Sequence, residues 1–230
     1  GAENLAVGFY EMSVTAADDA GNSTTGTLPF EVIDRQPTTI GLNLGWNLIS
    51  LPAAPSDASI ETVLADPSTG TGMTTISQVY SLQGGVWHVA TYNVDTGAWD
   101  GTLTQITDGH AYFVRSTSFD PIKYVSAAFD PVAAQPVYKL SAGWNGIGVT
   151  SPESEVLASS YLASLGSEWS TLRSYNGASG EATLYSTGVA TSGFATETAD
   201  LNGDGDTTDA VVSAGAGYFV FVKADVDLAP

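Results

Sequence analysis

The sequence predicts a mainly β chain made of two tandem β-sandwich-like or barrel-like repeats, each with one short helix, preceded by a β-hairpin. The main observation is an internal repeat: Leu42–Ile49 (LNLGWNLI) returns 98 residues later as Leu140–Ile147 (LSAGWNGI). A second matching pair, Gly109–Val114 (GHAYFV) and Gly215–Val220 (GAGYFV), closes each unit. A fixed period of this size indicates two copies of one unit of about a hundred residues, which is an ordinary domain size. We expect three parts, a hairpin with its linker, a first repeat and a second repeat, over residues 1–36, 37–132 and 133–230.

The repeat also separates structural residues from functional candidates. Residues that both copies share are best explained by the fold. We therefore expect Trp46 and Trp144, which occupy the same place in the two copies, to lie in the core. Residues that only one copy contains are the candidates for function.

Residues 1 to about 35 are expected to form the hairpin. Between Tyr10 and Ala16, apolar residues alternate with polar ones, which is the period of a half-buried strand. The cluster Asp18–Asn22 predicts the turn, and the second strand passes through Leu28 to Val32. An isolated hairpin is only marginally stable in water. We therefore expect it either to belong to a larger Ig-like domain or to complete a sheet supplied by another chain.

Each repeat is expected to contain one short helix. In the first repeat, Ser56 or Asp57 is the predicted N-cap and Asp66-Pro67 ends the helix. In the second repeat, apolar residues at helical spacing run from Val156 to Leu165, and Gly166 follows at the helix end.

Strands are expected on either side of these helices. The first repeat opens with a strand over Leu42–Leu51, and turns at Gly84-Gly85 and Asp95–Gly97 indicate hairpins in its middle region. Strongly apolar strands, Ala111–Val114 and Tyr218–Val222, close the two repeats.

The charge of the chain excludes some classes of partner. Lys plus Arg number 6 against 25 Asp plus Glu, which gives a formal net charge of −19. Nucleic-acid binding depends on Lys and Arg that displace counterions from phosphates, so we expect no nucleic-acid partner. An anionic membrane surface would repel this chain as well. The acidic surface is compatible with cation binding or with a salty medium that screens self-repulsion.

Several absences narrow the prediction further. The chain has no cysteine, which excludes disulfides, thiolate metal sites and cysteine nucleophiles. No run of about 18 apolar residues is present, so we expect no membrane insertion of this segment. The chain begins at Gly1 without a signal peptide, and we expect it to be a mature fragment or an excised part of a longer protein.

Two segments resemble parts of known surface proteins. Tyr10–Asn22 (YEMSVTAADDAGN) resembles the last hairpin of bacterial and archaeal Ig-like surface domains. The phrase GWNLISLP at Gly45–Pro52, followed by an aromatic region and Gly-x-x-Tyr-Phe-Val, is similar to modules of large archaeal and bacterial surface and S-layer-associated proteins. The second copy departs from that phrase at Gly146–Thr150 (GIGVT). The resemblance, which covers nearly all of residues 40–226, implies a non-catalytic building block and no defined ligand.

The sharpest functional signal is the acidic loop DLNGDGDTTD, which only the second copy contains. Calcium takes about six to eight oxygen ligands, and a loop with oxygen-bearing side chains at alternate positions and Gly205 at the sixth supplies them. The loop resembles calcium loops of the dockerin and thrombospondin-repeat type, although Val211 stands where an EF-hand has Glu. The alternative is a solvated acidic turn. The predicted Ca²⁺ ligands are Asp200, Asn202, Asp204, Asp206 and Asp209.

Other motifs give weaker predictions. Asp18, Asp19 and Asn22 are a second calcium candidate, but a tight turn stabilised by Asp and Asn explains them better. Asn22 also begins the N-glycosylation sequon Asn-Ser-Thr. Trp87 and Trp99, present in the first copy only, suggest a sugar-stacking face, and the alternative is core or interface packing.

We expect no catalysis. His88 and His110 are the only histidines, and no nucleophile elbow or phosphate loop is present. The sequence therefore predicts a non-catalytic structural or adhesive module of an extracellular, S-layer-like surface protein, stabilised by calcium. Its expected partners are other surface subunits, neighbouring domains of a longer chain and surface glycans. The alternative function is a carbohydrate-binding accessory module of a secreted hydrolase.

Overall fold

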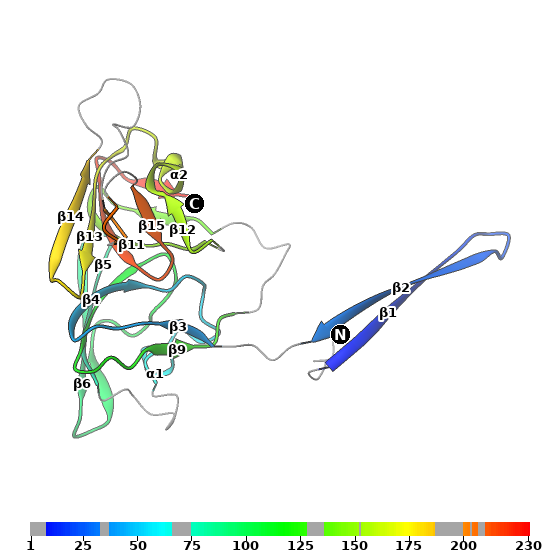
Figure 1. The fold of residues 1–230 in the computed structure, drawn as a ribbon, viewed down its shortest axis with the longest axis horizontal. Helices are drawn as coiled ribbons and strands as arrows, with labels where there is room; N and C mark the ends of the chain where they lie inside the picture. The colour runs from blue at the N-terminus through cyan, green and yellow to red at the C-terminus, as the bar shows by residue number, and fades with distance from the viewer. Residues whose placement is uncertain are drawn as a thin grey trace. The chain divides into compact units, whose positions relative to one another are not determined.

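Antiparallel strands make up most of the residues that the structure describes, and the prediction of a mainly β fold is confirmed (Figure 1). The computed structural model describes residues 8–32, 37–65, 75–127, 136–151, 153–186, 200–202, 204–206 and 210–230. The chain divides into two compact units between Gln36 and Pro37. The predicted boundary between residues 132 and 133 lies outside the described residues.

The first unit holds one hairpin, of β1 (Gly8–Ala17) and β2 (Ser23–Val32). The two strands pair in one unbroken antiparallel register, in which Met12 lies opposite Leu28. Apolar residues therefore share one face of the hairpin, as the sequence alternation predicts.

The first half of the second unit, residues 37–127, contains a five-stranded and a two-stranded sheet. The larger sheet has the strand order β4-β8-β5-β6-β7, and β3 pairs with β9 in the smaller one. The elements are β3 (Thr38–Ile40), β4 (Gly45–Ser50), α1 (Ile60–Val63), β5 (Ile76–Gln83), β6 (Val86–Asn93), β7 (Ala98–Gly101), β8 (Ala111–Ser116) and β9 (Ile122–Tyr124).

The second half, residues 136–230, contains a four-stranded sheet of order β11-β16-β13-β14 and two small sheets, β10-β17 and β12-β15. The strands and helices are β10 (Tyr138–Leu140), β11 (Gly143–Gly148), β12 (Glu155–Leu157), α2 (Ala158–Tyr161), the 3₁₀ helix η1 (Ala163–Leu165), β13 (Trp169–Asn176), β14 (Glu181–Ser186), β15 (Val211–Ser213), β16 (Gly217–Val222) and β17 (Val226–Leu228).

The strand pairings of the two halves correspond. Asn47 of β4 lies opposite Val114 of β8, and Asn145 of β11 lies opposite Val220 of β16. The next strand, β5 or β13, pairs with the other edge of β8 or β16, and in both halves the register shifts near its start. Each half has its own buried cluster of apolar side chains, so the second unit contains two cores.

The Gly-Trp-Asn phrase begins β4 and β11, and its asparagine holds the turn that precedes each strand. The buried Asn47 side chain accepts a hydrogen bond from Asn43 N at 2.7 Å and donates to Asn43 O at 2.8 Å. Asn145 makes the same pair of bonds with Ser141, at 3.1 and 2.7 Å. The preceding Gly45 has φ +87°, a conformation that favours glycine.

The expectation that the repeated tryptophans lie in the core is wrong. Neighbouring residues of a strand point to opposite faces. Asn47 and Ile49 are buried, so Trp46 points to the other face of its sheet and is only half-buried. Trp144 is half-buried in the same way beside Asn145.

Substitution of the buried asparagine tests its role in the turn. We expect Asn145→Ala, at a side chain only 2 % exposed, to lower the free energy of unfolding by about 2–3 kcal/mol, because it leaves backbone groups without partners. Urea unfolding measures the change. The control is Asn176→Ala: the exposed Asn176 side chain also accepts two backbone N–H bonds, but water replaces it, so we expect a loss below about 1 kcal/mol. Equal losses would contradict the assigned role.

Both helices begin later than predicted. The N-cap of α1 is Ser59 rather than Ser56 or Asp57, although the Asp57 carboxylate accepts a bond from Ser59 N at 2.9 Å. In the second half, Val156 lies in β12, opposite Val212 of β15, and the helix starts only at Ala158. Pairing with a strand distant in sequence therefore overrides the local helical pattern.

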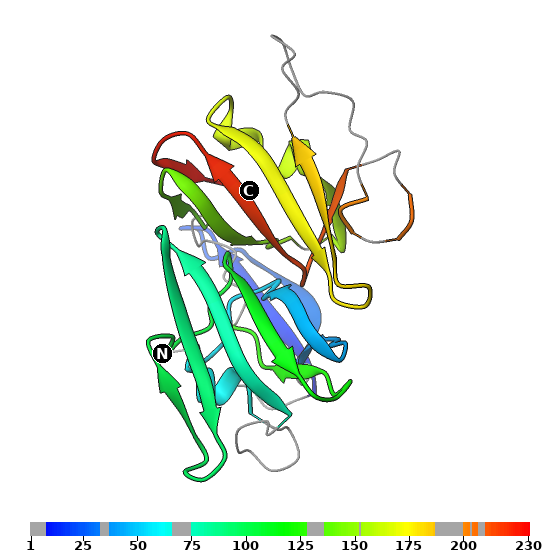
Figure 2. The same ribbon diagram turned by 90° about the vertical axis from the view of Figure 1, so that its left-hand side faces the viewer.

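The two halves meet at a reciprocal junction. Isolated antiparallel bridges join Ile49 to Ala216 and His110 to Ile147. Because Ile49 corresponds to Ile147 and His110 to Ala216, each half offers the same patch to the other, as in a two-fold contact. At the centre, the ring of Phe113 meets that of its counterpart Phe219 at 5.6 Å. Figure 2 shows the strands of both halves side by side, the first half below and the second above.

Glycines of the second half make this junction close. A Cβ on Gly148 would lie 2.6 Å from Ser50 Cβ, and one on Gly217 would lie 2.6 Å from Ile49 O. The hydroxyl of Ser50 donates to Ala216 O at 2.8 Å and accepts a hydrogen bond from Val149 N at 3.3 Å. The departure of the second copy from the repeated phrase therefore lies at the junction between the halves.

Candidate functional site

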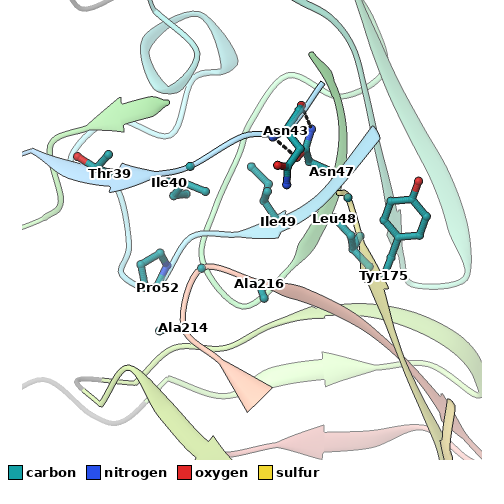
Figure 3. Close-up of a pocket in the computed structure, with 13 residues that line it drawn as sticks. Thr39, Ile40, Asn43, Asn47, Leu48, Ile49, Pro52, Tyr175, Ala214 and Ala216 are labelled. Carbon is teal, nitrogen blue, oxygen red and sulfur yellow. Dashed lines mark hydrogen bonds between the residues drawn. The ribbon is translucent and has the colours of Figure 1, made fainter. Parts of the chain in front are cut away.

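A polar pocket of about 300 Å³ lies at the junction (Figure 3). In Figure 3, Asn43 and Asn47 stand together on the first half, while Ala214, Ala216 and Tyr175 belong to the second. No acidic or basic side chain is among its lining residues. The described part of the pocket therefore has no group suited to proton transfer near neutral pH.

The structure describes four of the predicted calcium ligands, Asp200, Asn202, Asp204 and Asp206, and these four do not form a complete metal site. Gly205 N donates to Asp200 Oδ2 at 3.1 Å, and Asp206 N donates to Asp204 Oδ1 at 2.7 Å. Gly205 has φ +92°, so this glycine makes the sharp turn that the sequence pattern requires. Asp209 lies outside the described residues.

One residue of this site was missed by the sequence analysis. The Asn202 amide nitrogen donates to Asp204 Oδ2 and to Glu155 Oε1, both at 3.1 Å. Glu155 belongs to β12, and no spacing rule connects it to the loop. Within the described ranges, no three Asp, Glu or His side chains form a group that could hold a metal ion. The oxygens of Asp200, Asn202, Asp204 and Glu155 are nevertheless of the type that calcium prefers.

The histidines do not form a catalytic arrangement in the described part of the chain. His110 forms a hydrogen bond with the backbone of Gly146 across the junction. Burial lowers the pKa of His110 below its ordinary value, although the charge of Asp108 acts in the opposite direction. His88 lies on β6 opposite Ser81, in the middle of a sheet. His110 therefore contributes a contact at the junction, where its counterpart in the second half is Ala216.

The Tyr138 hydroxyl links the two halves near His110, and the Tyr161 hydroxyl bonds within the second half beside the junction. Tyr138 donates to Asp108 Oδ2 at 2.9 Å and to Thr150 Oγ1 at 3.3 Å. Tyr161 donates to Gly148 O at 2.8 Å. Burial raises the pKa of both Tyr138 and Tyr161 above the ordinary tyrosine value.

The two aromatic residues proposed for sugar stacking lie in different surroundings. Trp87 is 52 % exposed. Trp99 is half-buried, packs against the core of the first half and contacts the ring of Tyr92 at 5.2 Å. Only Trp87 is therefore placed to meet a ligand.

The second calcium candidate forms an ordinary turn. The Asp18 carboxylate accepts bonds from Ala20 N, Asn22 N and Asn22 Nδ2 at 2.8–3.0 Å. The Asn22 side chain, followed by its backbone N–H, lowers the pKa of Asp18. The nitrogen that a glycan would occupy is thus engaged in this turn.

Two broader findings complete the description. Among the described residues, no helix has the length and apolar character needed to span a membrane. Comparison with protein families, with curated proteins and with solved structures gives no match for this chain.

Proposed function

We propose that the chain is a non-catalytic structural or adhesive module of an extracellular, S-layer-like surface protein. In this proposal its two halves are copies of one sandwich-like module, and the hairpin belongs to an Ig-like domain. The observation that carries the proposal is the reciprocal junction. Backbone bridges and the Phe113–Phe219 contact join the halves at their sheets, which suits a part that transmits load.

Surface labelling tests this proposal. Antibodies raised against the purified chain should label intact cells of the organism that produces it. Labelling that appears only after the cells are opened would overturn the extracellular assignment.

We also propose that calcium stabilises the acidic loop. Asn202 now points its amide N–H groups at two carboxylates, Asp204 and Glu155. A bound cation would supply positive charge at the same place, and Asn202 would then present its amide oxygen. The carboxylates, brought close by the loop, would no longer repel one another.

A melting experiment tests calcium binding. Calcium at about 100 times its dissociation constant should stabilise the fold by about 2.7 kcal/mol and raise the melting temperature by roughly 5–10 °C over that in chelator. Asp204→Asn should remove most of this rise. The control Asp95→Asn, in an exposed turn of the first half, should leave it unchanged. An identical melting curve with and without chelator would overturn the calcium proposal.

The alternative function, a carbohydrate-binding accessory module, is favoured by the exposure of Trp87 alone. Its ring is inclined by 55° to that of Phe219, its neighbour at 5.9 Å. Retention on a polysaccharide column that Trp87→Ala abolishes would support this function over the structural one.

A further inference from the structure

Five aromatic side chains surround a pocket of about 530 Å³ on the outer face of the sheets. They are Trp46, Tyr80, Trp87, Phe113 and Tyr175. The first four belong to β4, β5, β6 and β8 of the first half, and Tyr175 comes from β13 across the junction. We refer to this site as the five-ring pocket. Since Trp87 is half-exposed, the pocket opens to solvent.

The rings stand as walls rather than as a platform. Trp46 is inclined by 62° to Tyr80 and by 85° to Phe113, at centroid distances of 5.6 and 6.3 Å. Phe113 is inclined by 75° to Tyr175 at 5.3 Å. A flat sugar ring needs a flat row of rings, which this arrangement does not offer. Aromatic faces arranged around a compact group are instead the recognition mode for quaternary ammonium ions.

The second half shows what such a ring attracts. Trp144 corresponds to Trp46, and the guanidinium carbon of Arg173 lies 5.1 Å from the centre of the Trp144 ring. By strand register Arg173 corresponds to Tyr80, because each lies opposite the equivalent phenylalanine, Phe219 or Phe113. The second half thus supplies its own cation, whereas the first half has a further ring in that place.

The second half also lacks another wall of the pocket. Leu82 of the first half corresponds to Tyr175 of the second. Trp87 lies opposite Leu82, whereas Ala182 lies opposite Tyr175. Tyr80 and Trp87 are therefore rings that only the first half contains. The lining of the five-ring pocket contains no Lys or Arg side chain, and the one cation–π contact found among the described residues is that of Arg173 over Trp144.

The chemistry of the lining selects the kind of cation. A primary ammonium or guanidinium group needs acceptors for its N–H groups. The five lining residues include no carboxylate and only two phenol oxygens. A quaternary ammonium ion has no N–H group and needs only aromatic faces. The net charge of −19 attracts cations to the whole molecule.

We propose that the five-ring pocket binds a choline-type quaternary ammonium group. This inference goes beyond the structural function proposed above and does not depend on it. The contact is non-covalent, between the positive charge of the ligand and the ring faces of Trp46, Tyr80 and Trp87.

The test compares choline with its uncharged isostere, 3,3-dimethylbutan-1-ol, on the unaltered chain. Both ligands have the same shape, so hydrophobic burial is matched and only the charge differs. We expect choline to change the tryptophan fluorescence in a saturable way and to bind at least about tenfold more tightly than the alcohol, in line with the strength of a desolvated cation–π contact. Equal affinities for the two ligands would overturn the proposal. So would the absence of a saturable change with choline up to about 100 mM, because a dissociation constant above that concentration is too weak for specific binding.

Variants locate the binding to this pocket. Tyr80→Leu should weaken choline binding about tenfold. The matched control Tyr92→Leu, on the neighbouring strand β6 and in contact with Trp99 rather than with the pocket, should leave it unchanged. Arg115→Gln should strengthen binding, because Arg115 lies opposite Trp46 and repels a second cation. Binding that responds equally to Tyr80→Leu and Tyr92→Leu, or a neutral oligosaccharide that displaces choline from the pocket, would contradict the assignment.

Discussion

Gly148→Ala is expected to destabilise the second unit by roughly 1–3 kcal/mol or more, the cost of overpacking a tight contact. The added Cβ would lie 2.6 Å from Ser50 Cβ and 2.8 Å from His110 O. The second of these atoms, His110 O, belongs to the backbone just before β8, so a change of side-chain rotamer cannot relieve this contact. The two halves would have to move apart, and Trp87 would lose its contact with Phe219.

Urea unfolding measures this loss, and tryptophan fluorescence reports the separation. Gly217→Ala should behave in the same way, because its Cβ would lie 2.6 Å from Ile49 O and 2.9 Å from Ala111 Cβ. Gly41→Ala is the control, since nothing lies within 4 Å of a Cβ there. Unfolding curves for Gly148→Ala and Gly41→Ala that coincide would contradict the close junction. Ser50→Gly should rescue Gly148→Ala only in part, because the His110 backbone remains in the way.

Alkaline pH is expected to unfold the second unit steeply. Burial raises the pKa of five tyrosines, and that of Tyr218 reaches about 12. In the unfolded chain a tyrosine ionises near its ordinary pKa of about 10. Between these two values the unfolded state releases protons that the folded state still holds, so stability falls as pH rises. For Tyr218 alone the loss from about pH 10 to about pH 12 is roughly 2–3 kcal/mol. The other four tyrosines with a raised pKa are Tyr112, Tyr124, Tyr138 and Tyr161.

Urea unfolding at several pH values from about 8 to 11, with tyrosinate absorbance in parallel, measures this dependence. Tyr218→Phe should flatten the decline, although it also removes the bond that Ser213 N donates to the Tyr218 hydroxyl at 2.9 Å. Tyr92→Phe, outside the group of five, is the control and should keep the full slope. A stability that does not change between pH 8 and 11 would show that these hydroxyls are not buried as described.

The sequence predicts those parts of the fold that local chemistry determines. Gly84 and Gly85 have positive φ and form the turn between β5 and β6, as their sequence signal indicates. Val156 shows the limit, because its local pattern is helical but its strand partner β15 lies far along the chain. The side to which Trp46 points depends on which face of the sheet is covered, and alternation alone does not contain that information.

The candidate sites show the same division. The acidic loop could be predicted because its proposed ligands are neighbours in sequence, whereas Glu155 reaches it only through the pairing of β12. The five-ring pocket takes its rings from five strands, so no motif marks it. A signal exists only when the copies are aligned by strand register: Tyr80 and Trp87 replace Arg173 and Ala182.

The glycines at the junction also restrict which halves can associate. Two copies of the first half would bring Ser50 against Ser50 and Ala111 against Ala111, where the present contact tolerates a side chain on one partner only. Such a mispaired assembly is sterically excluded, while the pairing of unlike halves is allowed. In a chain with several modules of this kind, these positions would keep a module of the first type from pairing with another of its own type.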